Sequence, residues 1–459
     1  MNYRHAFHAG NHADVLKHLV LSRIFALLSR KEAPFAYLDS HAGVGLYDLA
    51  GDQASRTGEW LQGIARIWQA EPHPALLDDY LGVIRQLNPD GALRYYPGSP
   101  ELARQLTREQ DRLQLNEKHP EDGALLKDNM AGAQNHLLAA AVCEAGGLGS
   151  IPAGMLNAEA LDAELTAIEA LTDRPYNVNF FCHQTPAADP TAFEAWHRML
   201  APMFAEFAID PASIPTSATR QPFDAAMAEV LERHKPALVS FHFGLPAPDL
   251  LQRARATGAK IASSATTVAE GLWLQQHGVD LVIAQGLEAG GHRGIFLSED
   301  LTTQLGTFAL LPQLVAALNV PVVAAGGIAD AGGVAAAQTL GAAGVQLGTA
   351  YLLCPESRTN ALHRAALKSP HAAHTALTTL FSGRPARGIV NRIMRELGPL
   401  PEGVPPFPLA GNAIGALRAQ TEKQGLDHCT PLWAGQNVSG CREIPAGQLT
   451  RELAAGWRA

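Results

Sequence analysis

Seven short apolar runs in the second part of the chain constrain its fold more than any other feature of the sequence. They occupy 148–151, 176–181, 238–243, 260–264, 281–285, 322–325 and 344–347. Helical patterns separate them, among these 158–171, 192–206, 249–257, 268–277 and 310–318. Because parallel strands need a long crossover, usually a helix, this alternation predicts a parallel α/β sheet. The number of units predicts a (β/α)8 barrel, whose remaining strand would lie before Met130.

The stretch 283–294 is the first candidate for a catalytic site. It reads I-A-Q-G-L-E-A-G-G-H-R-G, so Gln285 ends an apolar run and four glycines surround His292. Glycine lets a backbone approach a flat or anionic ligand closely, and barrels carry their chemistry beyond the carboxyl ends of the strands. An imidazole at this position is a candidate catalytic base. The alternative is a surface loop with an incidental histidine.

Two glycine-rich turns follow the last two apolar runs. They read A-G-G-I-A-D at 325–330 and Q-L-G-T at 346–349. Such turns present backbone N–H groups to an anion, and barrels frequently bind phosphate in the loops after strands 7 and 8. The pair therefore predicts a phosphate site, unless the glycines only turn the chain.

These motifs together resemble the flavin-dependent nitronate monooxygenases, formerly called 2-nitropropane dioxygenases. Further matches are M-A-G at 130–132, A-G-G-L-G-S at 145–150, N-V-N-F-F at 177–181, S-F-H-F-G at 240–244 and F-S-G-R-P-A-R-G at 381–388. The resemblance covers Met130 to about Trp457. It implies oxidation of a nitroalkane or nitronate with O₂ to a carbonyl compound and nitrite, with His292 as the catalytic base.

The same resemblance implies an FMN site. By position, FMN would be held by Met130, Asn179, Gln285, Gly290, Gly327, Gln346, Leu347, Gly348 and Thr349. The side chains of Asn179 and Gln285 can hydrogen-bond the carbonyl and N–H edge of the flavin. The alternative for Asn179 is a residue at a strand end that caps a neighbouring helix.

The first 129 residues follow a different pattern. Four histidines and Lys17 surround a helix start, and 14–28 has helical apolar spacing at Val15, Leu16, Leu19, Val20, Ile24 and Leu27. Spacing alone favours an exposed polar face for the histidines, with no third ligand that would complete a metal site. A strand then ends in D-S-H-A-G-V-G at 39–45, which resembles a first nucleotide-binding turn. Y-Y-P-G-S-P at 95–100 predicts a turn, and 113–117 predicts a strand that ends in an acid.

Four segments of this part resemble the large-subunit ribosomal RNA adenine-N6 methyltransferases, the J-type enzyme of 23S rRNA. They are N-Y-R-H-A-F-H-A-G-N-H-A-D-V-L-K-H at 2–18, L-D-S-H-A-G-V-G-L-Y at 38–47, R-Y-Y-P-G-S-P at 94–100 and L-N-E-K-H-P-E-D at 115–122. The resemblance implies that S-adenosylmethionine contacts His18, His41, Ser99 and Glu117, and that Tyr3 faces RNA. The D-P-P-[YF] catalytic loop of that family is missing downstream of residue 129. The sequence therefore predicts a truncated Rossmann-like methyltransferase fragment, with the S-adenosylmethionine site as a remnant and no methyl transfer.

Length and composition limit the remaining possibilities. A chain of 459 residues exceeds one ordinary core, and we expect a methyltransferase-like fragment at 1–129 and an FMN barrel at 130–459. The net charge of −9 argues against nucleic acid as a partner. Five scattered cysteines and the lack of a signal pattern or membrane span predict a cytoplasmic protein without a structural metal. The oligomeric state is left open.

Three alternatives remain at this point. The chain could be an FMN-dependent enoyl-acyl carrier protein reductase, which shares the barrel and a similar Gly-Gly-His loop. It could be an S-adenosylmethionine- or RNA-binding module fused to a barrel, or a non-functional fusion. In every case the segment 123–129 (G-A-L-L-K-D-N) is expected to be a compromised first barrel strand, because its residues favour a helix and include two charges.

Overall fold

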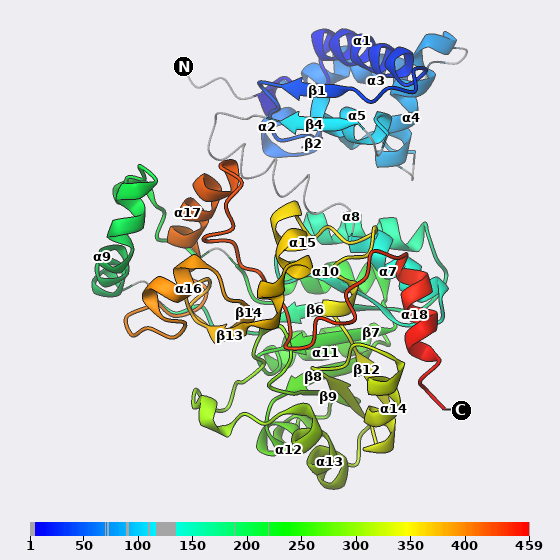
Figure 1. Ribbon diagram of the computed structural model, residues 1–459. Coiled ribbons are helices and arrows are strands. Elements are labelled where there is room, and N and C mark those ends of the chain that lie inside the picture. Colours follow the sequence, from blue (N-terminus) through cyan, green and yellow to red (C-terminus); the bar gives the residue numbers. More distant parts are fainter. Residues whose placement is uncertain are drawn as a thin grey trace. The chain divides into compact units, whose positions relative to one another are not determined.

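The computed structural model describes residues 5–68, 70, 73–88, 91–108, 111–115, 135–187, 189–218 and 220–458. The chain divides into two compact units, Met1–Ala133 and Gln134–Ala459 (Figure 1). The expected first barrel strand at 123–129 lies outside the described residues. No described helix is long and apolar enough to cross a membrane.

The first unit pairs two strands in parallel across a helical connection. Its elements are η1 His5–Phe7, α1 His12–Leu28, β1 Ala36–Asp39, β2 Leu46–Asp48, α2 Asp52–Thr57, η2 Glu59–Gln62, α3 Ile64–Trp68, η3 Ala75–Leu77, α4 Asp78–Leu87, β3 Tyr95–Pro97, α5 Ser99–Leu106 and β4 Arg112–Leu115. Strands β1 and β4 are parallel, with Asp39 opposite Leu115. The parallel pair agrees with the predicted Rossmann-like fragment.

The turn predicted at 95–100 is wrong in part. Residues Tyr95–Pro97 form β3, which pairs antiparallel with β2, and α5 begins at Ser99. Aromatic residues favour strands when a neighbouring strand is available. Pro100 lies in the first turn of α5, where its fixed φ suits a helix.

Helix α1 was predicted at the correct place, but its buried face was not. The side chains that point inward are Asp14, His18, Ser22 and Phe25, whereas Leu16, Val20, Ile24 and Leu27 are exposed. The expectation of an exposed polar face is therefore wrong for His18, which is fully buried. Apolar residues lie around most of α1, so their spacing did not distinguish its two faces. The polar face is buried because it finds hydrogen-bond partners inside the unit.

The second unit contains a seven-stranded parallel sheet, and all seven predicted strands are confirmed. They are β5 Gly149–Pro152, β6 Tyr176–Phe181, β7 Leu238–His242, β8 Lys260–Ala265, β9 Leu281–Gln285, β11 Val322–Ala325 and β12 Gly344–Gln346. Their spatial order is β12-β11-β9-β8-β7-β6-β5, which is the chain order reversed. This order is that of a barrel wall. Within the described residues, β5 and β12 are its two edges.

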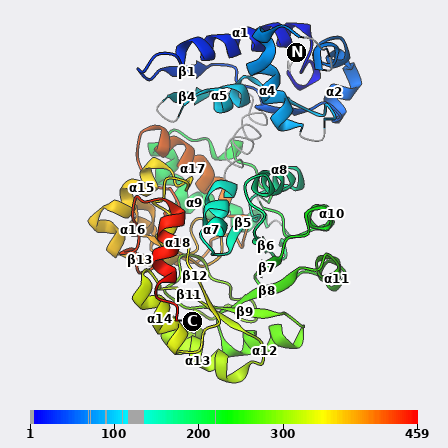
Figure 2. The same ribbon diagram turned by 90° about the vertical axis from the view of Figure 1, so that its right-hand side faces the viewer.

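Helices cover the outer face of this sheet (Figure 2). They include α7 Asn135–Glu144, α8 Ala158–Glu169, α10 Ala225–His234, α11 Pro248–Ala256, α12 Val268–Gln276, α13 Thr307–Ala317, α14 Ala331–Thr339 and α18 Ala446–Ala454. Side-chain oxygens of Asn157, Asp224, Thr267 and Asp330 cap the helices that follow them. The caps fix where each crossover helix begins. A core of aliphatic and aromatic residues, including Val178, Val239 and Ile261, fills the layer between strands and helices.

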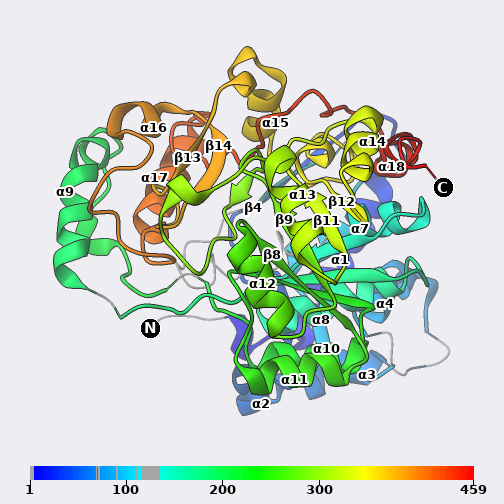
Figure 3. The same cartoon turned by 90° about the horizontal axis from the view of Figure 1, so that it is seen from below.

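A smaller antiparallel sheet carries the candidate base. It consists of β10 Gly291–His292, β13 Thr375–Thr378 and β14 Ala386–Ile389, in the order β10-β14-β13. Helices α9 Pro190–Glu206, α16 Arg392–Leu397 and α17 Gly411–Lys423 share a hydrophobic cluster near it (Figure 3). The remaining elements are η4 Pro211–Ser213, η5 Leu301–Thr303, η6 Thr349–Tyr351, α15 Ala361–Lys368 and η7 Pro370–Ala373.

Candidate active site

The loop after β9, which carries His292, packs against two other segments of the chain: β14 and residues 434–435. In β10, His292 stands opposite Ala386 of β14. Gly291 has a φ of 73°, which favours glycine. A Cβ added at Gly290 would lie 2.5 Å from the Gly435 nitrogen and 2.6 Å from the Ala434 carbonyl carbon, so only glycine fits there. The glycines predicted to admit a ligand also let the loop pack against its own chain.

Hydrogen bonds fix the backbone around His292. The Gln285 amide donates through Nε2 to the His292 carbonyl oxygen at 2.9 Å. Its Oε1 accepts from the Gly294 N–H at 2.7 Å. The guanidinium of Arg293, which is fully buried, donates to the carbonyl oxygens of Gln285 and Gly286. The loop therefore has a defined conformation with His292 at its centre.

A second imidazole, His242, supports the same carbonyl. Its Nε2 donates to the His292 carbonyl oxygen at 3.1 Å, and its Nδ1 lies 3.1 Å from the Ser264 hydroxyl. Burial lowers the pKa of His242 to about 4, so the ring is neutral near pH 7. With Nε2 donating to a carbonyl, Nδ1 accepts from Ser264. The hydrogen bonds of His242 are thus used to hold the loop.

The His292 ring lies among aromatic side chains with one polar partner. Its Nε2 is 2.8 Å from the Ser382 hydroxyl oxygen. Ring centroids of Phe181, Phe243, Phe407 and Trp433 lie 5.8, 6.0, 5.4 and 5.5 Å from the imidazole centroid. Burial, followed by the charge of Arg220, lowers the pKa of His292 well below its usual value. The imidazole is therefore neutral and can accept a proton.

Most of the predicted flavin residues lie at or just beyond the carboxyl ends of the parallel strands. Asn179 lies in β6, Gln285 ends β9, Gly327 follows β11, and the turn 346–349 follows β12. Gly326 and Gly327 have φ values of 113° and 75°. The Asp330 side chain accepts from the Gly333 N–H at 2.7 Å and so caps α14 itself. An anion in this turn would therefore meet the backbone of the glycines, because a carboxylate already occupies the helix end. Met130 lies outside the described residues.

Asn179 does not cap a helix in this structure. Its Nδ2 donates to the Ser240 hydroxyl at 2.8 Å, and Asn177 donates to the same oxygen at 2.8 Å. Ser240 belongs to β7, so both amides cross-link adjacent strands. The Asn179 side chain is half-buried two residues before the carboxyl end of β6, near the end of the barrel that would hold a cofactor.

Sequence reasoning missed the groups that surround the base. Ser382 and Arg384 lie in the F-S-G-R-P-A-R-G segment, and His242 and Phe243 in S-F-H-F-G, both of which were noted only as whole motifs. The contact between His292 and Ser382 spans 90 positions of sequence. A serine two residues before an arginine in a glycine- and proline-containing segment was the available signal.

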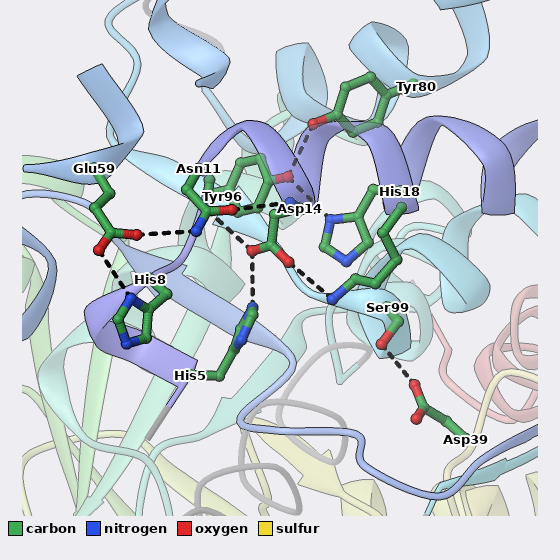
Figure 4. A network of polar contacts seen from close by, with 12 residues as sticks. His5, His8, Asn11, Asp14, His18, Asp39, Glu59, Tyr80, Tyr96 and Ser99 are labelled. Atoms are coloured by element: carbon green, nitrogen blue, oxygen red, sulfur yellow. Dashed lines mark hydrogen bonds and ion pairs between the residues drawn. The ribbon is translucent and has the colours of Figure 1, made fainter. Parts of the chain in front are cut away.

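In the first unit, polar residues meet in two groups (Figure 4). The buried Asp14 carboxylate accepts from His5 Nε2 at 2.8 Å and lies 2.8 Å from Lys17 Nζ. Burial raises the pKa of Asp14, but the hydrogen bond from His5 and the nearby charges lower it overall. His18 Nδ1 is 3.0 Å from the Tyr96 hydroxyl. Burial lowers the pKa of His18 to about 3, so this ring is neutral.

The second group forms where β1 ends. Asp39 accepts from the Ser99 hydroxyl at 2.6 Å and from the His41 backbone N–H at 3.0 Å. The structure thus brings Ser99 and the backbone of His41 to one carboxylate, while His18 lies in the other group. Glu117 and Tyr3, the remaining predicted contacts, lie outside the described residues.

Comparisons with known proteins match the two parts to different families. The family model described as nitronate monooxygenase matches residues 115–456. The model described as ribosomal RNA large subunit methyltransferase D, RlmJ, matches residues 32–153. A nitronate monooxygenase of Pseudomonas aeruginosa is 44% identical over 336 residues, which are 72% of this chain and 94% of that protein. One from Paraburkholderia phytofirmans is 41% identical, covering 72% and 91%.

A solved structure agrees with the sequence comparisons. Nitroalkane oxidase from Streptomyces ansochromogenes superposes with a TM-score of 0.65 and 40% identity, covering 71% of this chain and 92% of that one. The match extends over most of the neighbour, which agrees with a TIM-like α/β fold for the second unit.

Proposed function

The chain belongs to the nitronate monooxygenase family, and from this premise we propose that it oxidises nitronates and nitroalkanes with O₂ to a carbonyl compound and nitrite. The observation that carries the proposal is the neutral, buried imidazole of His292, held beside Ser382 among aromatic rings. Residues 32–153 match a methyltransferase family model, which supports the interpretation of the whole chain as a chimera.

The residues present fit an FMN cofactor. Backbone N–H groups at Gly326 and Gly327, with positive φ, suit a phosphate, and the half-buried Asn179 amide suits the polar edge of a flavin. FMN would be held by Met130, Asn179, Gln285, Gly290, Gly327 and the turn Gln346 to Thr349. When bound, FMN supplies the electron acceptor for the nitronate and the reaction with O₂.

The protein's own groups account for the proton step. If Nε2–H of His292 donates to Ser382, Nδ1 carries the lone pair that takes the α-proton of a nitroalkane. The aromatic rings around the imidazole limit water near the reacting carbon. Deprotonation makes an imidazolium next to an anionic nitronate, and this opposite pair is stabilising in a site of low dielectric. A preformed nitronate needs no such step.

Oxygen consumption with a nitroalkane and with its preformed nitronate, with nitrite measured in parallel, tests the proposal. We expect oxygen uptake and nitrite release without NADH. Oxidation of NADH by an enoyl thioester, with no nitrite from either nitro compound, would identify an enoyl reductase instead and refute the proposal.

For the first unit we propose a remnant S-adenosylmethionine site without methyl transfer. The support is the group at the end of β1, where the Asp39 carboxylate gathers Ser99 and His41. His18 and Glu117 would complete the site by resemblance. Transfer to an exocyclic amine needs a loop that orients the amine, and no Asp-Pro-Pro sequence occurs downstream of residue 129. Nucleic acid is therefore not proposed as a substrate.

Titration calorimetry of the full chain with S-adenosylmethionine tests the remnant. We expect measurable binding that Ser99→Ala weakens, and no methylation of 23S rRNA fragments. Methylated RNA would refute the absence of transfer, and the absence of any heat of binding would refute the remnant.

The five cysteines are all free, which supports the further proposal of a reducing, cytoplasmic environment.

A further inference from the structure

Three nitrogen-bearing side chains from different segments of the chain converge on the ring of Phe407. The imidazole centroid of His183 lies 4.7 Å from the Phe407 centroid, and that of His292 lies 5.4 Å away. The guanidinium carbon of Arg220 lies 5.5 Å from the same ring. His183 follows β6, Arg220 precedes α10, and His292 belongs to β10. The fold therefore places a cation and a second imidazole beside the candidate base.

Both of these neighbours of His292 have buried nitrogen atoms that make no hydrogen bond in the described part of the chain. His183 is 5% exposed, and neither ring nitrogen makes a hydrogen bond to the residues that the structure describes. The backbone of Arg220 lies beside this ring and raises its pKa, against the larger lowering effect of burial. The buried Nη1 of Arg220 makes no hydrogen bond in the described part of the chain.

Burying these nitrogen atoms without hydrogen-bond partners destabilises the folded protein unless a ligand supplies the missing partners. Burial lowers the pKa of Arg220 to about 10 and that of His183 to about 4. The arginine therefore stays charged although it is poorly solvated, and the histidine stays neutral with one N–H to donate. Arg220 as a whole is half-buried, but its Nη1 atom is removed from solvent. A counter-ion stabilises a partly desolvated cation, and buried polar atoms without partners are uncommon in folded proteins. Arg384, 4.0 Å from the ring of Phe243, adds a second positive charge near this place.

The missing partner is an anion other than the cofactor phosphate. His183 and Arg220 flank β6 and α10, whereas the glycine turns follow β11 and β12. Three strands, β7, β8 and β9, separate β6 from β11 in the sheet. After burial, Arg220 makes the largest contribution to lowering the pKa of His292, so its charge acts directly at the proposed base. An anion bound by Arg220 would lie next to the group that handles the α-proton.

We infer that Arg220 and His183 form an oxyanion subsite that binds the oxygens of the substrate's nitro group and positions its α-carbon at His292. The inference rests on the proposed function. A planar guanidinium can donate two parallel N–H bonds to the two oxygens of a planar nitronate, and the imidazole N–H adds a donor. Because a nitronate carries a full negative charge and a nitroalkane does not, this subsite favours the nitronate. Arg220 and His183 are positioning residues, and neither takes part in proton transfer.

Inorganic nitrate is a suitable probe, because it is a planar anion with the same O–N–O geometry. Nitrate binding to the full-length FMN-loaded protein is measured by titration calorimetry, with chloride as an anion that lacks this shape. The variants are Arg220→Gln, Arg220→Lys and His183→Gln. Arg253→Gln is the matched control, since Arg253 pairs with Glu232 on the surface.

For Arg220→Gln we expect nitrate affinity to fall about tenfold to a hundredfold, the range for hydrogen bonds to a charged group. KM for a nitronate should rise by a similar factor with kcat changed less, Arg220→Lys should recover part of both, and His183→Gln should have a smaller effect. Arg253→Gln should change nothing. If Arg220→Gln fails to fold, Arg220→Lys and His183→Gln still test the inference, because both variants must weaken nitrate binding.

Two outcomes would overturn the inference. In the first, nitrate affinity and KM are unchanged in the Arg220 and His183 variants while nitronate oxidation proceeds, which leaves the proposed function intact. In the second, Arg220→Gln loses FMN but still binds nitrate, which would assign the arginine to the cofactor. Nitrate binding that depends on Arg220, in a protein that oxidises no nitronate, would support the subsite and refute the proposed function.

Discussion

Replacing His292 by alanine should separate the two substrates of the proposed reaction. The imidazole is neutral because burial and the Arg220 charge keep its pKa low, and Ser382 fixes the ring through Nε2. Loss of a general base typically costs about 10²- to 10⁴-fold in rate. Turnover of a neutral nitroalkane should therefore fall by at least about 10²-fold. A preformed nitronate has already lost the proton, so its turnover should fall by about tenfold or less, from lost packing alone.

The assay is oxygen uptake with both substrates, at equal FMN content. His371→Ala is the control, because that imidazole is exposed. The pH dependence adds a second measurement. A base with a lowered pKa stays deprotonated as pH falls below about 6.5, so kcat/KM for the nitroalkane should hold its value there and decline only through the lowered pKa. Equal losses on both substrates, or a decline centred at or above about pH 6.5, would refute the assignment of His292 as base.

Three further predictions concern the fold around the site. Gly290→Ala should lower the melting temperature and nitroalkane turnover, because the added Cβ would lie 2.5 Å from the Gly435 nitrogen. The control Gly415→Ala should change neither, because a Cβ at that position meets open space. Equal melting temperatures for the two variants would contradict the prediction. Burial holds the pKa of His183, His242 and His363 at about 4, so stability that is fully present above about pH 6.5 should be lost as pH falls toward about 4. A melting temperature that stays constant over that range would show that these rings are not buried neutral. The segment 123–129 lies outside the described residues, and replacing it with an apolar strand ending in Ala-Pro should raise FMN retention. The reason is that β5 and β12 are sheet edges in the described part of the chain. The prediction would be contradicted if the native protein is already fully loaded with FMN and the replacement leaves the FMN content unchanged.

The barrel strands could be predicted because buried parallel strands are continuous apolar runs. Residues of β9, for example, face the core on one side and helices on the other, so nearly every position is apolar. Helix α1 shows the limit of the same reasoning. Its buried face carries Asp14, whose partners His5 and Lys17 are close in sequence, and His18, whose partner Tyr96 lies 78 positions away. No local pattern in 12–28 contains this information.

The candidate base could be located from the sequence, but the groups that act on it could not. His292 was indicated by glycines within a few residues of it. Arg220 and Phe407 meet near His292 only after the loops of several strands fold over the sheet. Their sequence surroundings contain no motif that distinguishes them from ordinary loop residues.

Gln285 shows why a residue's chemical capacity does not determine what it binds. Its carboxamide was predicted to meet the flavin edge, because it offers both a donor and an acceptor at a strand end. In the structure that donor and acceptor serve the His292 carbonyl and the Gly294 N–H, at 2.9 and 2.7 Å. One N–H and one lone pair of the amide remain for a ligand, so Gln285 can bind a cofactor edge and hold the catalytic loop together. A change such as Gln285→Leu would remove both interactions. FMN affinity and the rate of the proton step should therefore fall together in that variant, whereas Ser382→Ala, which affects only the orientation of His292, should lower the rate alone.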